Sequence, residues 1–103
     1  MGLQINTGLT TSDGGTVASG AYVNFNTYFP MGTTSYQCDL GVWRNEQART
    51  NGLSQIKPIE IPELFFQVTL TEQEFAALTL GAVNDSVVAY LEQFVGQGNV
   101  SIV

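Results

Sequence analysis

Residues 21–43, which read AYVNFNTYFPMGTTSYQCDLGVW, decide the fold. Large and polar side chains alternate on both sides of Pro30, Met31 and Gly32, and a period of two predicts strands with one buried face. The short break between the two runs predicts an antiparallel pair joined by a loop of about five or six residues. The face expected in the core carries Val23, Phe25, Thr27, Phe29, Tyr36, Cys38, Leu40 and Val42.

The chain after this pair contains a polar stretch, a connector and a further strand. Residues 45–54, NEQARTNGLS, are polar and contain the turn signal Asn51-Gly52, so a long exposed loop is expected. Pro58 and Pro62 interrupt the isoleucines that follow, which predicts an extended connector or an edge strand. Residues 64–70, LFFQVTL, predict another strand.

Two short helices and a last strand are expected in the C-terminal third. Thr71 and Glu74 have the spacing of a capping box, in which each side chain satisfies a free backbone amide of the first turn. Gly81 is expected to end this helix. A second helix is expected to begin at Asn84 or Asp85 and to pack its apolar face on the sheet, before a short strand at the end of the sequence.

The N-terminal residues 1–20 hold few large apolar side chains, and they contain the turn-forming sequence Asp13-Gly14-Gly15. Leu3, Ile5 and Leu9 could form one short strand, but the segment as a whole is expected to be either a mobile tail or an arm that lies on a neighbouring subunit. Residues 21–103 then form a single β-rich domain, since 103 residues are too few for two cores. The predicted fold class is α+β, predominantly antiparallel, as a sandwich or partly open barrel with one or two short C-terminal helices.

The composition favours a subunit that is covered by partners. Charged residues make up only 12% of the chain, and interface centres are depleted of charge. Nine acidic and three basic residues give a net charge of -6. Three scattered cations are too few to neutralise a run of phosphates, so direct nucleic-acid binding is not expected. No apolar run reaches the roughly 18 residues of a membrane span and no signal peptide is recognisable, so we expect synthesis in the cytoplasm and no membrane partner.

Catalytic chemistry is not expected, because the chain contains no histidine and a single cysteine. It therefore lacks the usual base near neutral pH and the commonest metal ligand. Cys38 falls on the predicted core face and has no second cysteine for a metal site or a redox pair. Of the acidic pairs, Glu60 and Glu63 flank a proline in the connector, while Glu72 and Glu74 suit the first turn of a helix. The prediction is a non-enzymatic protein without catalytic residues, cofactor or metal.

Aromatic side chains on the polar faces and in turns are the remaining functional signal. Interface centres are enriched in aromatic residues, Met and Arg. Trp43 suits either an interface anchor or a cover for the edge of its own core. Tyr28 and Trp43 also suit an alternative function, a carbohydrate-binding or adhesion module that stacks sugar rings on aromatics. The candidate interface residues are Tyr28, Phe29, Met31, Trp43 and Arg44.

A Gly- and Thr-rich start, two alternating strands, a proline-flanked connector and a late helix follow one another along the chain. The segments read AYVNFNTYF at 21–29, YQCDLGVWR at 36–44, LTEQEF at 70–75 and VVAYLEQF at 87–94. This arrangement resembles that of small structural proteins of tailed bacteriophages, in particular those that infect Bacteroidetes. The resemblance implies a virion subunit of the capsid, head-tail connector or tail, which forms homo-oligomers and contacts other virion proteins. It implies no particular functional residues.

Overall fold

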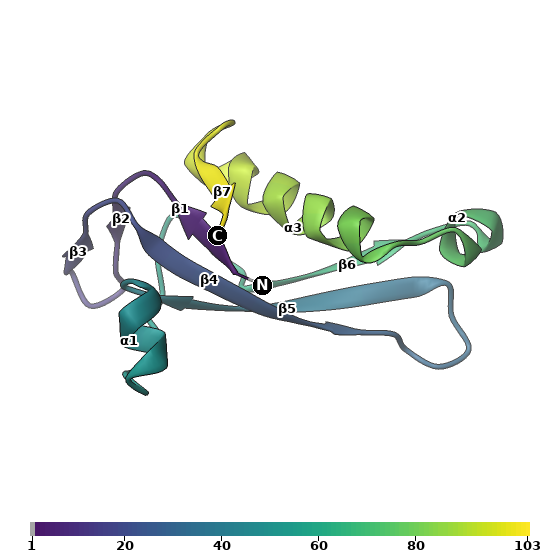
Figure 1. The fold of residues 1–103 in the computed structure, drawn as a ribbon, viewed down its shortest axis with the longest axis horizontal. Coiled ribbons are helices and arrows are strands. Elements are labelled where there is room, and N and C mark those ends of the chain that lie inside the picture. Colours follow the sequence, from purple (N-terminus) through teal and green to yellow (C-terminus); the bar gives the residue numbers. More distant parts are fainter. Residues whose placement is uncertain (1) are drawn as a thin grey trace.

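A long antiparallel hairpin is the centre of the fold (Figure 1). The structure is a computed structural model that describes residues 2–103. In it, β4 (Ala21–Tyr28) and β5 (Ser35–Trp43) pair with Val23 opposite Val42. Opposite residues of paired strands point to the same face, so the two alternating apolar sets meet on one side of the hairpin. Both strands are confirmed, and the predicted core face is buried at Val23, Tyr36, Cys38, Leu40 and Val42. Phe29, which was expected on that face, follows the end of β4 and is 54% exposed.

Five strands form the main sheet, and every neighbouring pair is antiparallel. A separate two-stranded sheet, β2 (Leu9–Thr10) and β3 (Thr16–Val17), lies at one end of the elongated molecule (Figure 1). These observations confirm an α+β fold with mostly antiparallel strands. The strands of the main sheet lie in the order β6 (Phe65–Thr69), β5, β4, β1 (Leu3–Ile5) and β7 (Val100–Ile102).

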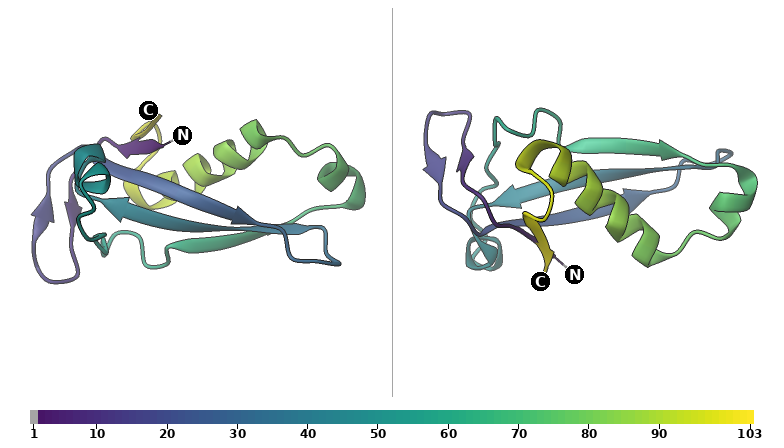
Figure 2. Two further views of the ribbon diagram at one scale, coloured as in Figure 1. Left: turned by 60° about the horizontal axis from the view of Figure 1, so that its bottom comes forward. Right: turned by 90° about the horizontal axis from the view of Figure 1, so that it is seen from above.

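A helix, α3 (Leu80–Val95), covers one face of this sheet (Figures 1 and 2). The helix begins earlier than expected, because the side chain of Thr79 accepts the N–H of Ala82 at 3.1 Å and Gly81 lies inside the first turn. Its 16 residues span about 24 Å, and the layer on the main sheet is a helix where a sandwich would have a second sheet. The structure therefore does not confirm a sandwich or barrel. Within residues 2–103, no helix is long and apolar enough to cross a membrane.

The short helix α2 (Glu72–Ala76) begins with the predicted capping box. The N–H of Glu74 donates to Thr71 Oγ1 at 3.2 Å, and the N–H of Thr71 donates to Glu74 Oε1 at 3.0 Å. The hydrogen bond from the backbone N–H of Thr71 lowers the pKa of Glu74 below its ordinary value, and the hydroxyl of Thr71 makes a smaller contribution in the same direction. The predicted helix start is confirmed.

Another short helix, α1 (Glu46–Thr50), occupies the stretch that was expected to be an exposed loop. The Asn45 side chain accepts the N–H of Ala48 at 2.7 Å, and Ala48 is buried. Asn51 caps the C-terminus of the helix, and Gly52 follows with a φ of 72°, so the predicted Asn-Gly turn is present and ends this helix. The loop prediction was wrong because a cap and a single buried alanine give a weak periodic signal.

The N-terminal segment departs furthest from expectation. Leu3 and Ile5 are fully buried, and β1 lies between β4 and β7 inside the main sheet. The N–H of Asn6 donates to the carbonyl of Asn99 at 2.7 Å. Leu3, Ile5, Leu9 and Val17 therefore belong to the core of their own chain, which corrects the arm or tail expected for residues 1–20; Met1 lies outside the described residues. The sequence suggests one short strand from Leu3, Ile5 and Leu9, and the structure has β1 at Leu3–Ile5; its place inside the main sheet was not predicted, because its partners are distant in sequence.

Candidate functional site

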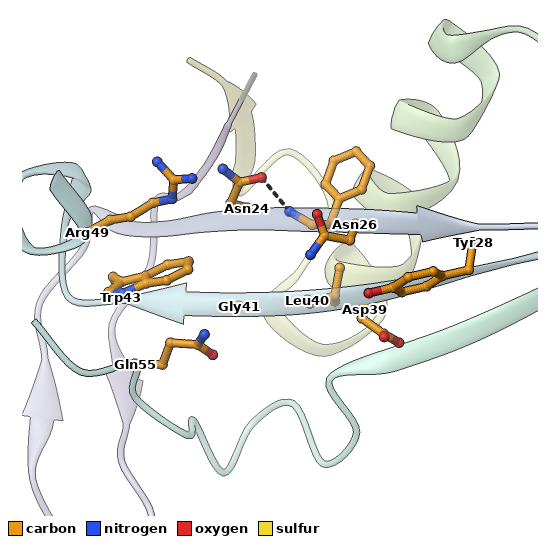
Figure 3. Close-up of a pocket in the computed structure, with 10 residues that line it drawn as sticks. Asn24, Asn26, Tyr28, Asp39, Leu40, Gly41, Trp43, Arg49 and Gln55 are labelled. Atoms are coloured by element: carbon orange, nitrogen blue, oxygen red, sulfur yellow. Dashed lines mark hydrogen bonds between the residues drawn. The ribbon is translucent and has the colours of Figure 1, made fainter. Parts of the chain in front are cut away.

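A hollow of about 300 Å³ lies over β4 and β5, on the face of the sheet opposite α3. Figure 3 shows Trp43 at one end of the hollow and Tyr28 at the other, with Gly41 on the strand between them. Two strands, α1 and the segment after α1 contribute its walls. Its other labelled lining residues are Asn24, Asn26, Asp39, Leu40, Arg49 and Gln55.

The Trp43 end of the hollow is fixed by contacts within the chain. The indole N–H donates to the carbonyl of Leu53 at 3.1 Å. The guanidinium carbon of Arg49 lies 5.6 Å from the centre of the Trp43 ring and 5.9 Å from that of Tyr22, within cation–π range. A Cβ at position 41 would lie only 2.7 Å from the indole, so the ring depends on Gly41. Trp43 thus packs on its own domain and still borders the hollow.

The hairpin tip and α2 lie together at one end of the molecule (Figure 1) and form a separate apolar surface. Met31 is fully exposed, and Phe29 is 54% exposed. The Phe29 ring centre lies 6.1 Å from that of Phe75, and a depression of about 240 Å³ opens between Phe29, Leu78 and Leu80. Exposed apolar patches on small proteins commonly mark contacts with other proteins.

The five candidate residues therefore do not form one site. Tyr28 and Trp43 border the hollow, Phe29 and Met31 form the tip, and the exposed Arg44 donates to the carbonyl of Thr16 at 3.4 Å. The alternation along β4 and β5 already placed the asparagines and the aspartate of the hollow on one face with Tyr28 and Trp43. Sequence reasoning missed two further lining residues, Arg49 and Gln55, because they come from segments outside the two strands.

The outer edge of β6 is a third functional candidate. The N–H of Leu40 donates to the carbonyl of Leu64 at 2.8 Å, and the N–H of Leu70 donates to the carbonyl of Thr34 at 3.0 Å. In an antiparallel ladder, alternate residues bond to the same neighbour, so the intervening residues of β6 direct their N–H and C=O groups away from β5. Within residues 2–103, no strand pairs with this edge. The outward residues are Phe65, Gln67 and Thr69.

The carboxylates with altered pKa values bind backbone amides of their own chain. Both side-chain oxygens of Glu60 accept the N–H of Thr10, at 2.8 and 2.9 Å, and this lowers the pKa of Glu60. Its contribution to stability is therefore present above its ordinary pKa and is lost as the pH falls through the lowered pKa. Within the described residues, no group of three His, Cys, Asp or Glu side chains could hold a metal ion. The acidic side chains with the clearest partners thus have structural roles.

Cys38 is fully buried, as its place in the alternating strand predicts. Burial raises the pKa of its thiol, and the nearby carboxylate of Asp39 adds to the rise against the opposing effect of Thr27. The thiolate is the reactive form, so a thiol reagent is expected to label the native protein at least about a hundredfold more slowly than the urea-unfolded chain. Complete labelling of the native protein at the unfolded rate would show that the strand opens freely.

Comparison of the chain with protein families, with curated proteins and with solved structures finds no match. Its function therefore has to be argued from its own surfaces. The hollow, the apolar tip and the outer edge of β6 are the three surfaces that we consider as binding sites for a ligand or a partner protein.

Proposed function

We propose that this protein is a non-enzymatic structural subunit whose copies associate through the outer edge of β6. The observation that carries the proposal is that, within residues 2–103, no strand pairs with the outer backbone groups of this edge strand, which contains no charged residue and no proline. Natural proteins usually protect such edges with lysine, proline, a bulge or a covering segment, because a free edge pairs with other chains. An edge without these devices suits a strand that is paired in an assembly.

Apolar surface beside the edge supports the same proposal. Phe65, the first residue of β6, is 52% exposed, and Ile59 in the preceding connector is 60% exposed. Both line a hollow of about 520 Å³, together with Pro62 and Leu64. Backbone pairing of one short strand is weak by itself, so burial of these side chains would supply the remaining affinity.

The outward residues of β6 allow two copies to pair about a two-fold axis. With Gln67 opposite Gln67 of the second copy, Phe65 lies opposite Thr69, and all the outward groups of both strands find partners. The same register places Leu70 of the second copy opposite Leu64, at the margin of the apolar hollow. A symmetric pair uses the same patch twice, which is the usual arrangement in homodimers.

We further propose that the assembly is part of a phage particle, in the capsid, the head-tail connector or the tail, where copies of this chain also contact other virion proteins. The resemblance of the segment order to phage structural proteins supports this placement, and the apolar tip around Met31 offers a second surface for a different subunit. Mass spectrometry of purified particles is expected to detect the protein at several copies per particle. Its absence from particles whose genome encodes it would contradict the placement.

Substitution of Gln67 by lysine tests the edge. Two lysines would face each other at the axis, and like charges directly opposite are destabilising, so dimer affinity is expected to fall by about tenfold or more. Light scattering coupled to size exclusion measures the mass over a range of concentrations. The matched control is Gln73→Lys, which makes the same change of charge on an exposed residue of α2. A monomeric wild-type chain, or equal effects of the two substitutions, would refute association through β6.

A further inference from the structure

We propose that the hollow between Tyr28 and Trp43 is a binding site for a neutral saccharide. This inference goes beyond assembly through β6, because it concerns the open face of the sheet. The hollow has aromatic rings at both ends and polar side chains along both walls (Figure 3). A saccharide has the matching chemistry, since its hydroxyl groups both donate and accept hydrogen bonds and its C–H faces pack on aromatic rings.

Several polar groups around the hollow are free to bind a ligand. Within residues 2–103, no group hydrogen-bonds to the side-chain amides of Asn26 and Gln55 or to the phenol of Tyr28. Asn24 uses its oxygen to accept the N–H of Phe25 at 2.7 Å, which leaves its NH₂ group. Asp39 accepts the Gln37 amide at 2.9 Å with one oxygen, which leaves the other. Donors and acceptors therefore alternate around one depression.

The charges of the hollow favour a neutral ligand. Asp39 and Arg49 are the two charged residues among those that line it, and their charges cancel. The chain as a whole has a net charge of -6, which repels acidic polymers over longer distances. A phosphorylated or sulfated ligand could pair with only one cation of the hollow, Arg49, and its guanidinium already lies over the rings of Tyr22 and Trp43.

The site is held in shape before a ligand arrives, which lowers the entropy cost of binding. The hydrogen bond from the indole to Leu53 and the neighbouring Arg49 fix Trp43, and the β4–β5 ladder fixes the polar residues, with Asn26 directly opposite Asp39. The volume of about 300 Å³ is at the lower end of ligand pockets, so one or two sugar rings would fill it.

Binding to an array of neutral and acidic glycans tests the proposal, and calorimetry then measures the dissociation constant for the strongest neutral glycan. Tyr28→Ala and Asn26→Ala are each expected to weaken binding by about tenfold, because each removes a group that borders the hollow. The matched control is Phe29→Ala, since Phe29 is 54% exposed against 51% for Tyr28 but lies outside the hollow. Circular dichroism establishes that each variant is folded.

Four outcomes would overturn the proposal. An array without binding would show that the protein does not bind saccharides. Unchanged affinity in both Tyr28→Ala and Asn26→Ala would show that binding does not occur in the hollow. Binding restricted to acidic glycans, or affinity that falls steeply with added salt, would contradict a neutral ligand. None of these results depends on Gln67, so the glycan experiments and the mass measurement on Gln67→Lys can fail independently of each other.

Discussion

Replacing Ile5 by alanine is expected to destabilise the protein by about 2–5 kcal/mol, the usual cost of truncating a fully buried aliphatic side chain. Ile5 has no exposed surface, and it pairs with Ala21 of β4 and Val100 of β7. A domain of this size has a total stability of about 5–15 kcal/mol, so the loss is a large fraction of it. Urea unfolding followed by the fluorescence of the single tryptophan, Trp43, is expected to show a midpoint lower by about 1–3 M.

Gln4→Ala is the matched control, because Gln4 occupies the same strand but points to the opposite face and is only partly buried. Its midpoint is expected to stay close to that of the wild type. Deletion of residues 2–8 extends the test, since it removes β1 and leaves β4 and β7 without their shared neighbour. If residues 1–20 acted as a detachable arm, the deleted chain would keep its circular dichroism spectrum and its cooperative unfolding.

The strands that sequence reasoning predicted well are those with long local patterns. The alternation from Ala21 to Trp43 fixes which residues face the core, and a hairpin needs only a short loop to bring its strands together. The capping box at Thr71 is likewise local, because its two hydrogen bonds join residues three positions apart. Local patterns of this kind can be recognised in a single sequence without knowledge of the fold.

The features that were missed depend on contacts between distant segments. A short strand at Leu3 and Ile5 was suggested by the sequence, but its position inside the main sheet was not, because three residues do not specify their partners and β1 gains its place from β4 and β7. Gly81 suggested the end of a helix, but the Thr79 cap starts α3 just before it, and packing of the helix on the sheet outweighs the glycine's cost of about 1 kcal/mol. Only part of the hollow was predictable, for the same reason. The residues on the hairpin follow from its alternation, whereas Arg49 and Gln55 come from segments whose position depends on the fold.

The two proposals are geometrically compatible. The residues opposite one another in paired strands point to the same face, so a two-fold axis through the β6 pair runs perpendicular to the joined sheet. The α3 helices of both copies would then cover one face, and both hollows would open on the other. Two weak saccharide sites on a common face act together on a polymeric glycan, and their combined affinity exceeds that of either alone.

A cysteine at position 67 is expected to link two copies covalently, and this is the sharpest test of the proposed register. In the proposed pair Gln67 lies opposite its own symmetry mate, where the Cα atoms of a hydrogen-bonded antiparallel pair are about 5.5 Å apart, a separation that a disulfide can span. Mild oxidation of Gln67→Cys should therefore give roughly tenfold more disulfide-linked dimer than oxidation of Gln73→Cys, which exposes a thiol away from the edge. Non-reducing electrophoresis measures the dimer, and the native Cys38 does not interfere because it is buried.

The same chemistry distinguishes the register from its neighbours. Phe65 and Thr69 face each other across the axis, so a mixture of Phe65→Cys and Thr69→Cys should give the mixed dimer in preference to either self-linked one. Efficient self-linking of Phe65→Cys would show that the strands pair in a shifted register. If Gln67→Cys links no faster than Gln73→Cys, the outer edge of β6 does not join two copies, and the unprotected strand would require a partner of different sequence.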